Sequence, residues 1–192
     1  MPTDPRDAVI VSAVRSPIGR ARKGSLAGMR PDDLSVQVIR AALDAVPALD
    51  PTEIEDLMLG CGLPGGEQGH NLARIVAVQL GLDTLPGCTI TRYCSSSVQT
   101  ARMAAHAIRA GEGDVFLAAG VETVSRFDKG SSDGLPGTRN PLFDDAQERT
   151  ARVAAEGASS SESTGWPRRR KPSRQMFVTS RYSHVVNFVS PR

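Results

Sequence analysis

Short apolar runs alternate with amphipathic segments through the first two thirds of the chain. Residues 8–14 (AVIVSAV) are β-branched and almost wholly apolar, which predicts a strand buried on both faces of a parallel sheet. Similar runs occupy residues 56–62, 87–93 and 115–121. We therefore expect four strands in this part of the chain.

Amphipathic segments separate these strands and predict helices over residues 31–46, 71–80 and 94–110. The first segment opens with a proline followed by two aspartates, which favour a helix start. In the third segment, the predicted inner face carries Val98, Ala101, Ala105 and Ile108. Because strand and helix alternate, the sequence predicts an α/β fold with a parallel sheet and right-handed crossovers.

The pattern changes after Ser125. Residues 128–140 are mostly turn-formers, and residues 159–192 have the composition of a disordered segment. From residue 161 onward seven basic residues accompany one acid, so binding to nucleic acid or another anionic partner is one interpretation of this tail. Basic runs in disordered tails are usually only solvated, and we expect no nucleic-acid partner.

The overall composition narrows the class of protein. The 192 residues carry a formal net charge of +2 and are 40% hydrophobic, as in soluble globular proteins. No apolar run approaches the ~20 residues of a membrane span, and the first residues lack the pattern of a signal peptide. Three cysteines without CxxC spacing argue against disulfides and a metal site. We expect a cytoplasmic protein with free thiols and no membrane association.

Cys94 is the candidate for chemistry because it lies where a predicted strand gives way to a predicted helix. A thiol at a helix start faces unsatisfied backbone N–H groups and the positive end of the helix dipole, both of which favour the thiolate. Buried packing is the common role of a cysteine at a strand end, so the residues alone leave both interpretations open. Cys61 and Cys88 lie among apolar or strand residues, which favours core packing for both.

Four segments resemble thiolase motifs in order and approximate spacing. Residues 92–99 (RYCSSSVQ) resemble the nucleophile signature Asn-Arg-x-Cys-Ser-Ser-Gly-x-Gln-Ala, with Thr91 where asparagine is usual and Ser97 where glycine is usual. Residues 14–19 (VRSPIG), 69–74 (GHNLAR) and 118–125 (AAGVETVS) resemble three further family segments. The nearest enzymatic rival, a β-ketoacyl synthase, lacks this cysteine context.

The resemblance implies a thiolase-like fold, of which this chain would hold the N-terminal half of an αβαβα layered architecture, incomplete. Residues 1–125 would form the α/β domain, residues 126–158 the start of an inserted loop domain, and residues 159–192 a tail outside the family. Cys94 would carry the acyl group between coenzyme A thioesters, either in thiolysis of a 3-ketoacyl-CoA, as in fatty-acid β-oxidation, or in condensation of acetyl-CoA. Coenzyme A acts there as substrate, and no metal or other cofactor is needed.

The family also uses a histidine, an asparagine and a second cysteine from its second half, which we expect this chain to lack. His106 is predicted about 18 Å from Cys94 along one helix, while His70 lies in a loop and His184 in the tail, so none is a credible base. Glu122 ends a strand, where a structural hydrogen-bond acceptor is at least as plausible as a functional acid. We expect an inactive truncated chain.

The resemblance leaves an alternative open. Thiolases pair through the strand before the nucleophile, here residues 87–93, into dimers or tetramers. A homo-oligomer is therefore expected, or a non-catalytic remnant that pairs with an intact thiolase.

Overall fold

The computed structural model describes residues 7–20, 22–126, 149, 152–153, 175–177 and 184–189. Its strands are β1 (Ile10–Arg15), β2 (Asp56–Gly60), β3 (Gly87–Ile90), β4 (Val115–Gly120), β5 (Gln175–Phe177) and β6 (His184–Val189). Its α-helices are α1 (Pro31–Asp44), α2 (Leu72–Gln79) and α3 (Ser96–Ala110). Short 3₁₀ turns are η1 (Pro51–Glu53), η2 (Gly66–Gln68), η3 (Tyr93–Ser95) and η4 (Val124–Arg126).

The strands form one sheet in the order β1-β6-β5-β4-β2-β3. Strand β2 pairs in parallel with both β3 and β4, so the predicted α/β fold with parallel strands is confirmed for this part. The sheet is mixed rather than wholly parallel, because β6 runs antiparallel to both β1 and β5. This departs from the sequence prediction, which had no strand after residue 121.

Two segments of the tail differ from the expected disorder. Strands β5 and β6 lie between β4 and β1 in the sheet, so the prediction was wrong for residues 175–177 and 184–189. Their β-branched and aromatic residues suit strands, and the sheet offers unpaired backbone groups beside β4 and β1. The remainder of the segment 159–192 lies outside the described residues, as does most of the segment 126–158.

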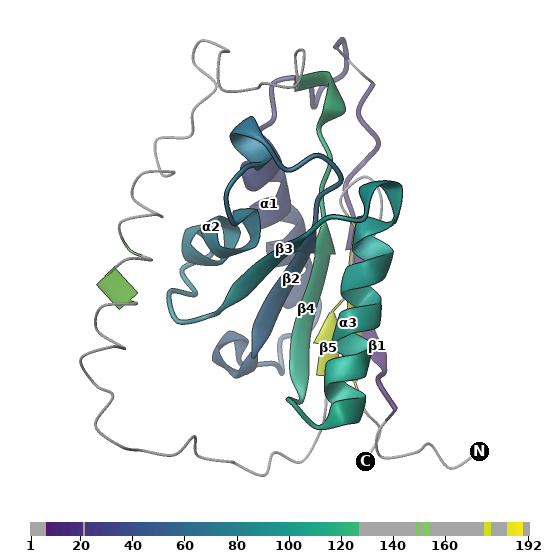
Figure 1. The fold of residues 1–192 in the computed structure, drawn as a ribbon, viewed down its shortest axis with the longest axis vertical. Helices are drawn as coiled ribbons and strands as arrows, with labels where there is room; N and C mark the ends of the chain where they lie inside the picture. The colour runs from purple at the N-terminus through teal and green to yellow at the C-terminus, as the bar shows by residue number, and fades with distance from the viewer. Residues whose placement is uncertain are drawn as a thin grey trace.

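The helices cover both faces of the sheet, with α1 and α2 on one side and α3 on the other (Figure 1). Alternate residues of β4 point to opposite faces: Leu117 joins the core under α1 and α2, whereas Phe116 joins the core under α3. Strand β1 was predicted to be buried on both faces, but Ile10 is 48% exposed. The reason is that β1 lies at the end of the strand order.

Helix α3 buries only part of the face that the sequence predicted: Ile108 is buried and Ala101 and Ala105 are partly buried, as expected, but Val98 is not. Its buried residues include Thr100, Ala104 and Ile108, whereas Val98 is 64% exposed. The Thr100 hydroxyl donates to the carbonyl oxygen of Ser97 at 2.8 Å and to that of Ala119 on β4 at 3.3 Å. A hydroxyl satisfied in this way suits a buried face, and Val98 is therefore left on the outer surface.

The start of α3 lies against the end of β2, and Gly60 makes this approach possible. A Cβ atom at Gly60 would lie 2.6 Å from the carbonyl carbon of Ser96 and from the nitrogen of Ser97. No side chain fits there, because real Cβ atoms essentially never approach backbone so closely. The helix start is thereby brought to the edge of the sheet where the parallel strands β2, β3 and β4 end.

Candidate functional site

Cys94 is the middle residue of η3, the 3₁₀ turn that directly precedes α3. The prediction that this thiol lies between a strand and a helix start is confirmed, although α3 begins at Ser96 rather than at Cys94. The residue before the thiol, Tyr93, has a φ of 46°, a left-handed conformation that costs energy for a bulky side chain. This turn carries the chain out of the sheet, and Cys94 is exposed.

Hydrogen bonds hold this turn in shape. The hydroxyl of Ser96 accepts from the Arg92 backbone N–H at 2.8 Å and donates to the Tyr93 carbonyl oxygen at 2.7 Å. The Arg92 guanidinium donates to Gln99 Oε1 at 2.6 Å. The residues on either side of Cys94 are therefore hydrogen-bonded to one another. These bonds hold Tyr93 in a left-handed conformation that its own backbone preference disfavours.

A cavity of about 490 Å³ opens beside Cys94. Five parts of the chain line it: the segment after β1, the start of α1, the end of β2 with the segment after it, the Cys94 turn with the first turn of α3, and the end of β4 with the segment after it. Apolar side chains such as Leu26, Leu63 and Val121 form much of the wall, and Ser97 lies at the α3 side. No histidine is among these lining residues of the described chain.

Glu122 also lines the cavity, and its carboxylate is occupied by hydrogen bonds. Oxygen Oε2 accepts from the Gly62 backbone N–H at 2.6 Å, and Oε1 accepts from Gln68 Nε2 at 3.0 Å. Glu122 therefore acts as a hydrogen-bond acceptor at this turn, which was one of the two interpretations that the sequence left open. Sequence reasoning missed Gln68, because nothing local to residue 68 indicates a partner that lies 54 residues further along the chain.

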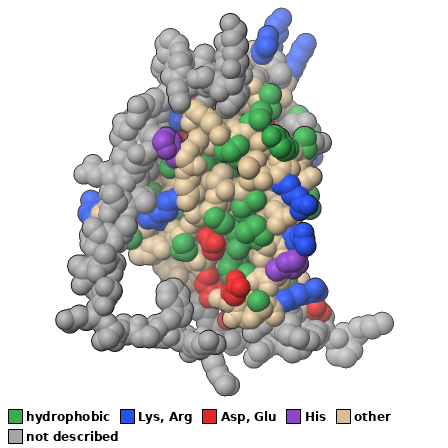
Figure 2. Space-filling model, viewed as in Figure 1, with side chains coloured by type: hydrophobic (Ala, Val, Ile, Leu, Met, Phe, Trp, Pro, Cys, Tyr) green, Lys and Arg blue, Asp and Glu red, His purple; other side chains and the backbone are tan. Residues whose placement is uncertain are grey.

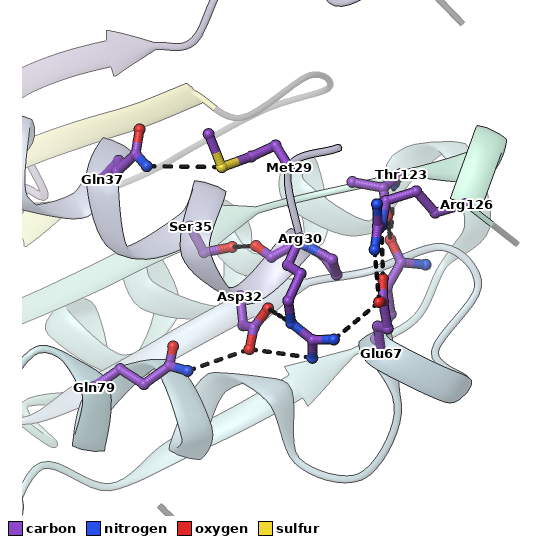
Figure 3. Close-up of polar contacts among 11 residues, drawn as sticks. Met29, Arg30, Asp32, Ser35, Gln37, Glu67, Gln79, Thr123 and Arg126 are labelled. Atoms are coloured by element: carbon purple, nitrogen blue, oxygen red, sulfur yellow. Dashed lines mark hydrogen bonds and ion pairs between the residues drawn. The ribbon is translucent and has the colours of Figure 1, made fainter. Parts of the chain in front are cut away.

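A buried cluster of ion pairs lies next to this wall (Figure 3). Glu67 accepts from Arg30 Nη1 at 2.8 Å and from Arg126 Nη2 at 2.7 Å, and Arg30 Nε also lies 3.0 Å from Asp32 Oδ1. The hydrogen bonds and charge of Glu67 raise the pKa of Arg126. We call these four residues the Glu67 cluster; it joins the start of α1 to η2 and to the segment after β4.

The other two cysteines lie in different surroundings. Cys61 is 0% exposed, and burial together with the nearby charge of Glu122 raises the pKa of its thiol to about 12. Cys88 is half-buried on β3; burial and the carboxylate of Asp56, 3.8 Å away, raise its pKa to about 11. The prediction of core packing is confirmed for Cys61, whereas Cys88 is only partly covered.

Neither His70 nor His106 is among the residues that line the cavity. His106 is exposed on α3, where basic side chains gather along the helix (Figure 2), so its interpretation as a solvated surface residue is confirmed. His70 is exposed in the loop before α2 with a φ of 54°. His184 belongs to β6, and its side chain lies outside the described residues.

Within the described part of the chain, no three or more His, Cys, Asp or Glu side chains are grouped so that they could hold a metal ion. The described helices include none with the length and apolar character needed to cross a membrane.

Comparison with known proteins points to one family. The family model "Thiolase, N-terminal domain" matches residues 8–153. A 3-ketoacyl-CoA thiolase of Saccharophagus degradans is 43% identical over 129 residues, which are 67% of this chain and 33% of the relative. A β-ketoadipyl-CoA thiolase of Escherichia coli is 43% identical over 122 residues, or 63% of this chain and 30% of the relative.

A solved structure agrees with these matches. The acetyl-CoA acetyltransferase of Bacillus anthracis superposes with a TM-score of 0.57 at 38% identity, covering 62% of this chain and 30% of that one. The match thus spans about a third of the length of the curated relatives.

Proposed function

Because the chain belongs to the thiolase family, matching its N-terminal domain over residues 8–153, we propose that it accepts an acyl group from an acyl-CoA thioester onto Cys94. The observation that carries this proposal is an exposed thiol, in the turn before a helix, that lines a cavity of about 490 Å³. The names of these relatives describe thiolases that act on acyl-CoA thioesters, which supports this class of substrate.

The proposed step exchanges one thioester for another. The Cys94 thiolate attacks the thioester carbonyl, a bond forms between Sγ and the acyl carbon, and the bond from that carbon to the sulfur of coenzyme A breaks. Coenzyme A leaves as a thiolate and takes up the proton that Cys94 gave up. Since both the reactant and the product are thioesters, the step needs no oxidant, metal or other cofactor.

The cavity supports a role in holding the acyl chain. Leu26, Leu63 and Val121 line it, and such apolar walls suit a fatty acyl group. Ser97 adds a hydroxymethyl group where the family signature usually has glycine, so we propose that this residue influences which acyl groups are accepted.

Complete turnover would need further groups. Proton transfer requires a base within hydrogen-bond reach, and the described residues that line the cavity include no histidine. We propose that the chain by itself takes up one acyl group per Cys94 without sustained turnover.

A second candidate function is pairing without catalysis. Strand β3 lies at the end of the strand order, so the backbone groups on its outer side could join a strand of another chain. We propose a second copy or an intact thiolase as that partner. This reading predicts association without acyl transfer, and the experiment on Cys94 separates the two functions.

The test is incubation of the full chain with acetyl-CoA, followed by intact-mass measurement and peptide mapping. We expect one acetyl group on Cys94, none on Cys94→Ser, and an unchanged adduct on Cys61→Ser, because Cys61 does not line the cavity. A folded wild-type chain that gains no acetyl group, or gains it equally in Cys94→Ser, would overturn the acyl-transfer proposal and leave pairing as the better candidate.

A further inference from the structure

The side chain of Gln68 joins the segments that follow β2 and β4. It is 1% exposed, and all of its contacts are complementary. Nitrogen Nε2 donates to the Leu63 carbonyl oxygen at 2.9 Å and to Glu122 Oε1 at 3.0 Å. Oxygen Oε1 accepts from the backbone N–H of Thr123 at 2.7 Å and from its hydroxyl at 2.9 Å. A buried amide satisfied this completely fixes its neighbours in one arrangement.

Glu122 passes this constraint to Gly62. Its second carboxylate oxygen accepts from the Gly62 N–H at 2.6 Å, a short charge-assisted hydrogen bond. A Cβ atom at Gly62 would lie 2.6 Å from that same oxygen. The peptide of Gly62 therefore lies directly against the carboxylate, and a side chain at this position would require the Glu122 carboxylate to move.

Gly62 in turn contacts the turn that carries Cys94. The Thr91 hydroxyl donates to the Gly62 carbonyl oxygen at 3.1 Å. A Cβ atom at Gly62 would lie 3.1 Å from the Tyr93 carbonyl oxygen, so the backbones of the two segments are in close contact. A continuous path of hydrogen bonds and contacts thus runs from Gln68 through Glu122 and Gly62 to the residues on the N-terminal side of Cys94.

We propose that Gln68 and Glu122 are positioning residues that set the orientation of the Cys94 thiol through Gly62. They do not themselves react. The inference rests on the proposed function only in taking Cys94 as the group whose position matters. The hydroxyl of Thr91 makes the last link, so the threonine found at the usual asparagine position has a defined role in this chain.

The neighbouring Glu67 cluster provides a matched control. Glu67 precedes Gln68 on η2 and is also buried, at 5% exposure, but it forms ion pairs with Arg30 and Arg126. It does not line the cavity. Loss of Glu67 should lower stability in general, whereas loss of Gln68 or Glu122 should also change the chemistry of Cys94.

The test compares the rate at which iodoacetamide alkylates Cys94 across a range of pH. In Glu122→Gln two amide donors face each other, and in Gln68→Glu two carboxylates do, so each variant breaks the path. We expect each to lower the alkylation rate about five-fold, as for the loss of one hydrogen bond. In the double variant Gln68→Glu/Glu122→Gln donor again faces acceptor between these two residues, while the Leu63 carbonyl oxygen still lacks its donor. We therefore expect the alkylation rate to rise above that of both parents by about two-fold or more without reaching the wild-type rate.

Thr91 keeps the test decisive where the buried variants fail to fold. Thr91 is exposed, so Thr91→Val removes the hydroxyl without disturbing the core, and we expect a reduction of a few-fold, about the value of one hydrogen bond. Thr91→Ser should retain the wild-type rate. The proposal is overturned if Thr91→Val reacts like the wild type, if the double variant stays as slow as its parents, or if Glu67→Gln slows alkylation equally.

Alkylation requires no acyl transfer. A wild-type chain that takes no acetyl group from acetyl-CoA therefore counts against the proposed function alone, while the alkylation rates decide the positioning role by themselves.

Discussion

Cys61 and Cys94 follow neighbouring parallel strands at the same edge of the sheet, yet their surroundings are opposite. After β2 the chain continues in the sheet layer, and the Cys61 N–H donates to the Ile90 carbonyl oxygen at 3.0 Å. After β3 the chain turns through Tyr93 in a left-handed conformation, and Cys94 emerges on the surface. Both residues are cysteines that follow strands of the same sheet. The path of the backbone after each strand therefore determines which thiol is exposed to solvent.

Burial also determines the protonation state of the two covered thiols, Cys61 and Cys88. Burial and Glu122 raise the pKa of Cys61 to about 12, and burial and Asp56 raise that of Cys88 to about 11. Thiolate is the nucleophilic form, so at neutral pH neither thiol competes for electrophiles. We therefore expect Cys94 alone among the three cysteines to react with electrophiles at neutral pH.

The largest expected effect is selective alkylation. At pH 8 only about one molecule in ten thousand has Cys61 as thiolate and about one in a thousand has Cys88 so, given their raised pKa values. We expect iodoacetamide to modify exposed Cys94 at least about a hundred-fold faster than either. Peptide mapping after a short pulse measures this ratio. In urea, where the chain is unfolded, the alkylation rates of the three cysteines should become similar. Alkylation of Cys61 as fast as Cys94 in the folded chain would contradict this prediction.

A second effect concerns stability in alkali. In the unfolded chain a thiol loses its proton near the ordinary value of 9.0, whereas Cys61 keeps its proton up to about pH 12. The unfolded state therefore binds fewer protons in this window, and stability falls as pH rises from about 9 to about 12, by roughly 1.4 kcal/mol per pH unit for each such thiol. Cys61→Ser, which does not ionise, should flatten this slope relative to Cys94→Ser.

Urea unfolding at a series of pH values between neutral and about pH 10.5 measures the slope. Equal slopes for the two serine variants would mean that the covered thiol contributes nothing to the alkaline loss of stability.

The smallest effect sharpens what surrounds the exposed thiol. Ser97 lines the cavity beside Cys94, whereas the adjacent Ser95 does not. Ser97→Gly should widen the cavity, and we expect the ratio of hexanoyl to acetyl transfer onto Cys94 to rise a few-fold, about what one or two methylene contacts contribute. Ser95→Gly is the matched control, since it makes the same change two residues earlier, in η3, at a position that does not line the cavity. An unchanged ratio in Ser97→Gly would remove this residue from acyl selection.

Much of the α/β part could be predicted from sequence because local patterns determine it. Apolar runs marked β2, β3 and β4 to within a few residues, and Pro31 marked the start of α1. Cys94 was placed between strand and helix by the same alternation. Its 3₁₀ turn could not be predicted, because a left-handed Tyr93 is unfavourable locally and is held there by Ser96 from the following helix.

Features that depend on distant segments were missed. Gln68 and Glu122 lie 54 residues apart, and no periodicity relates them. The exposure of Val98 likewise depends on which face of α3 the sheet covers, and the helical spacing of small residues left that ambiguous. Strands β5 and β6 were missed because their place in the sheet depends on the gap between β1 and β4, which no local pattern records.

Gly60 carries a last consequence. Gly60 has no side chain, so the backbone of β2 is in direct contact with the backbone at the start of α3. No flexible side chain lies between the strand and the helix to absorb a movement of either. Any displacement of the end of β2 must reach the beginning of α3 almost undiminished. The position of the Cys94 turn, which directly precedes α3, therefore follows the position of the sheet.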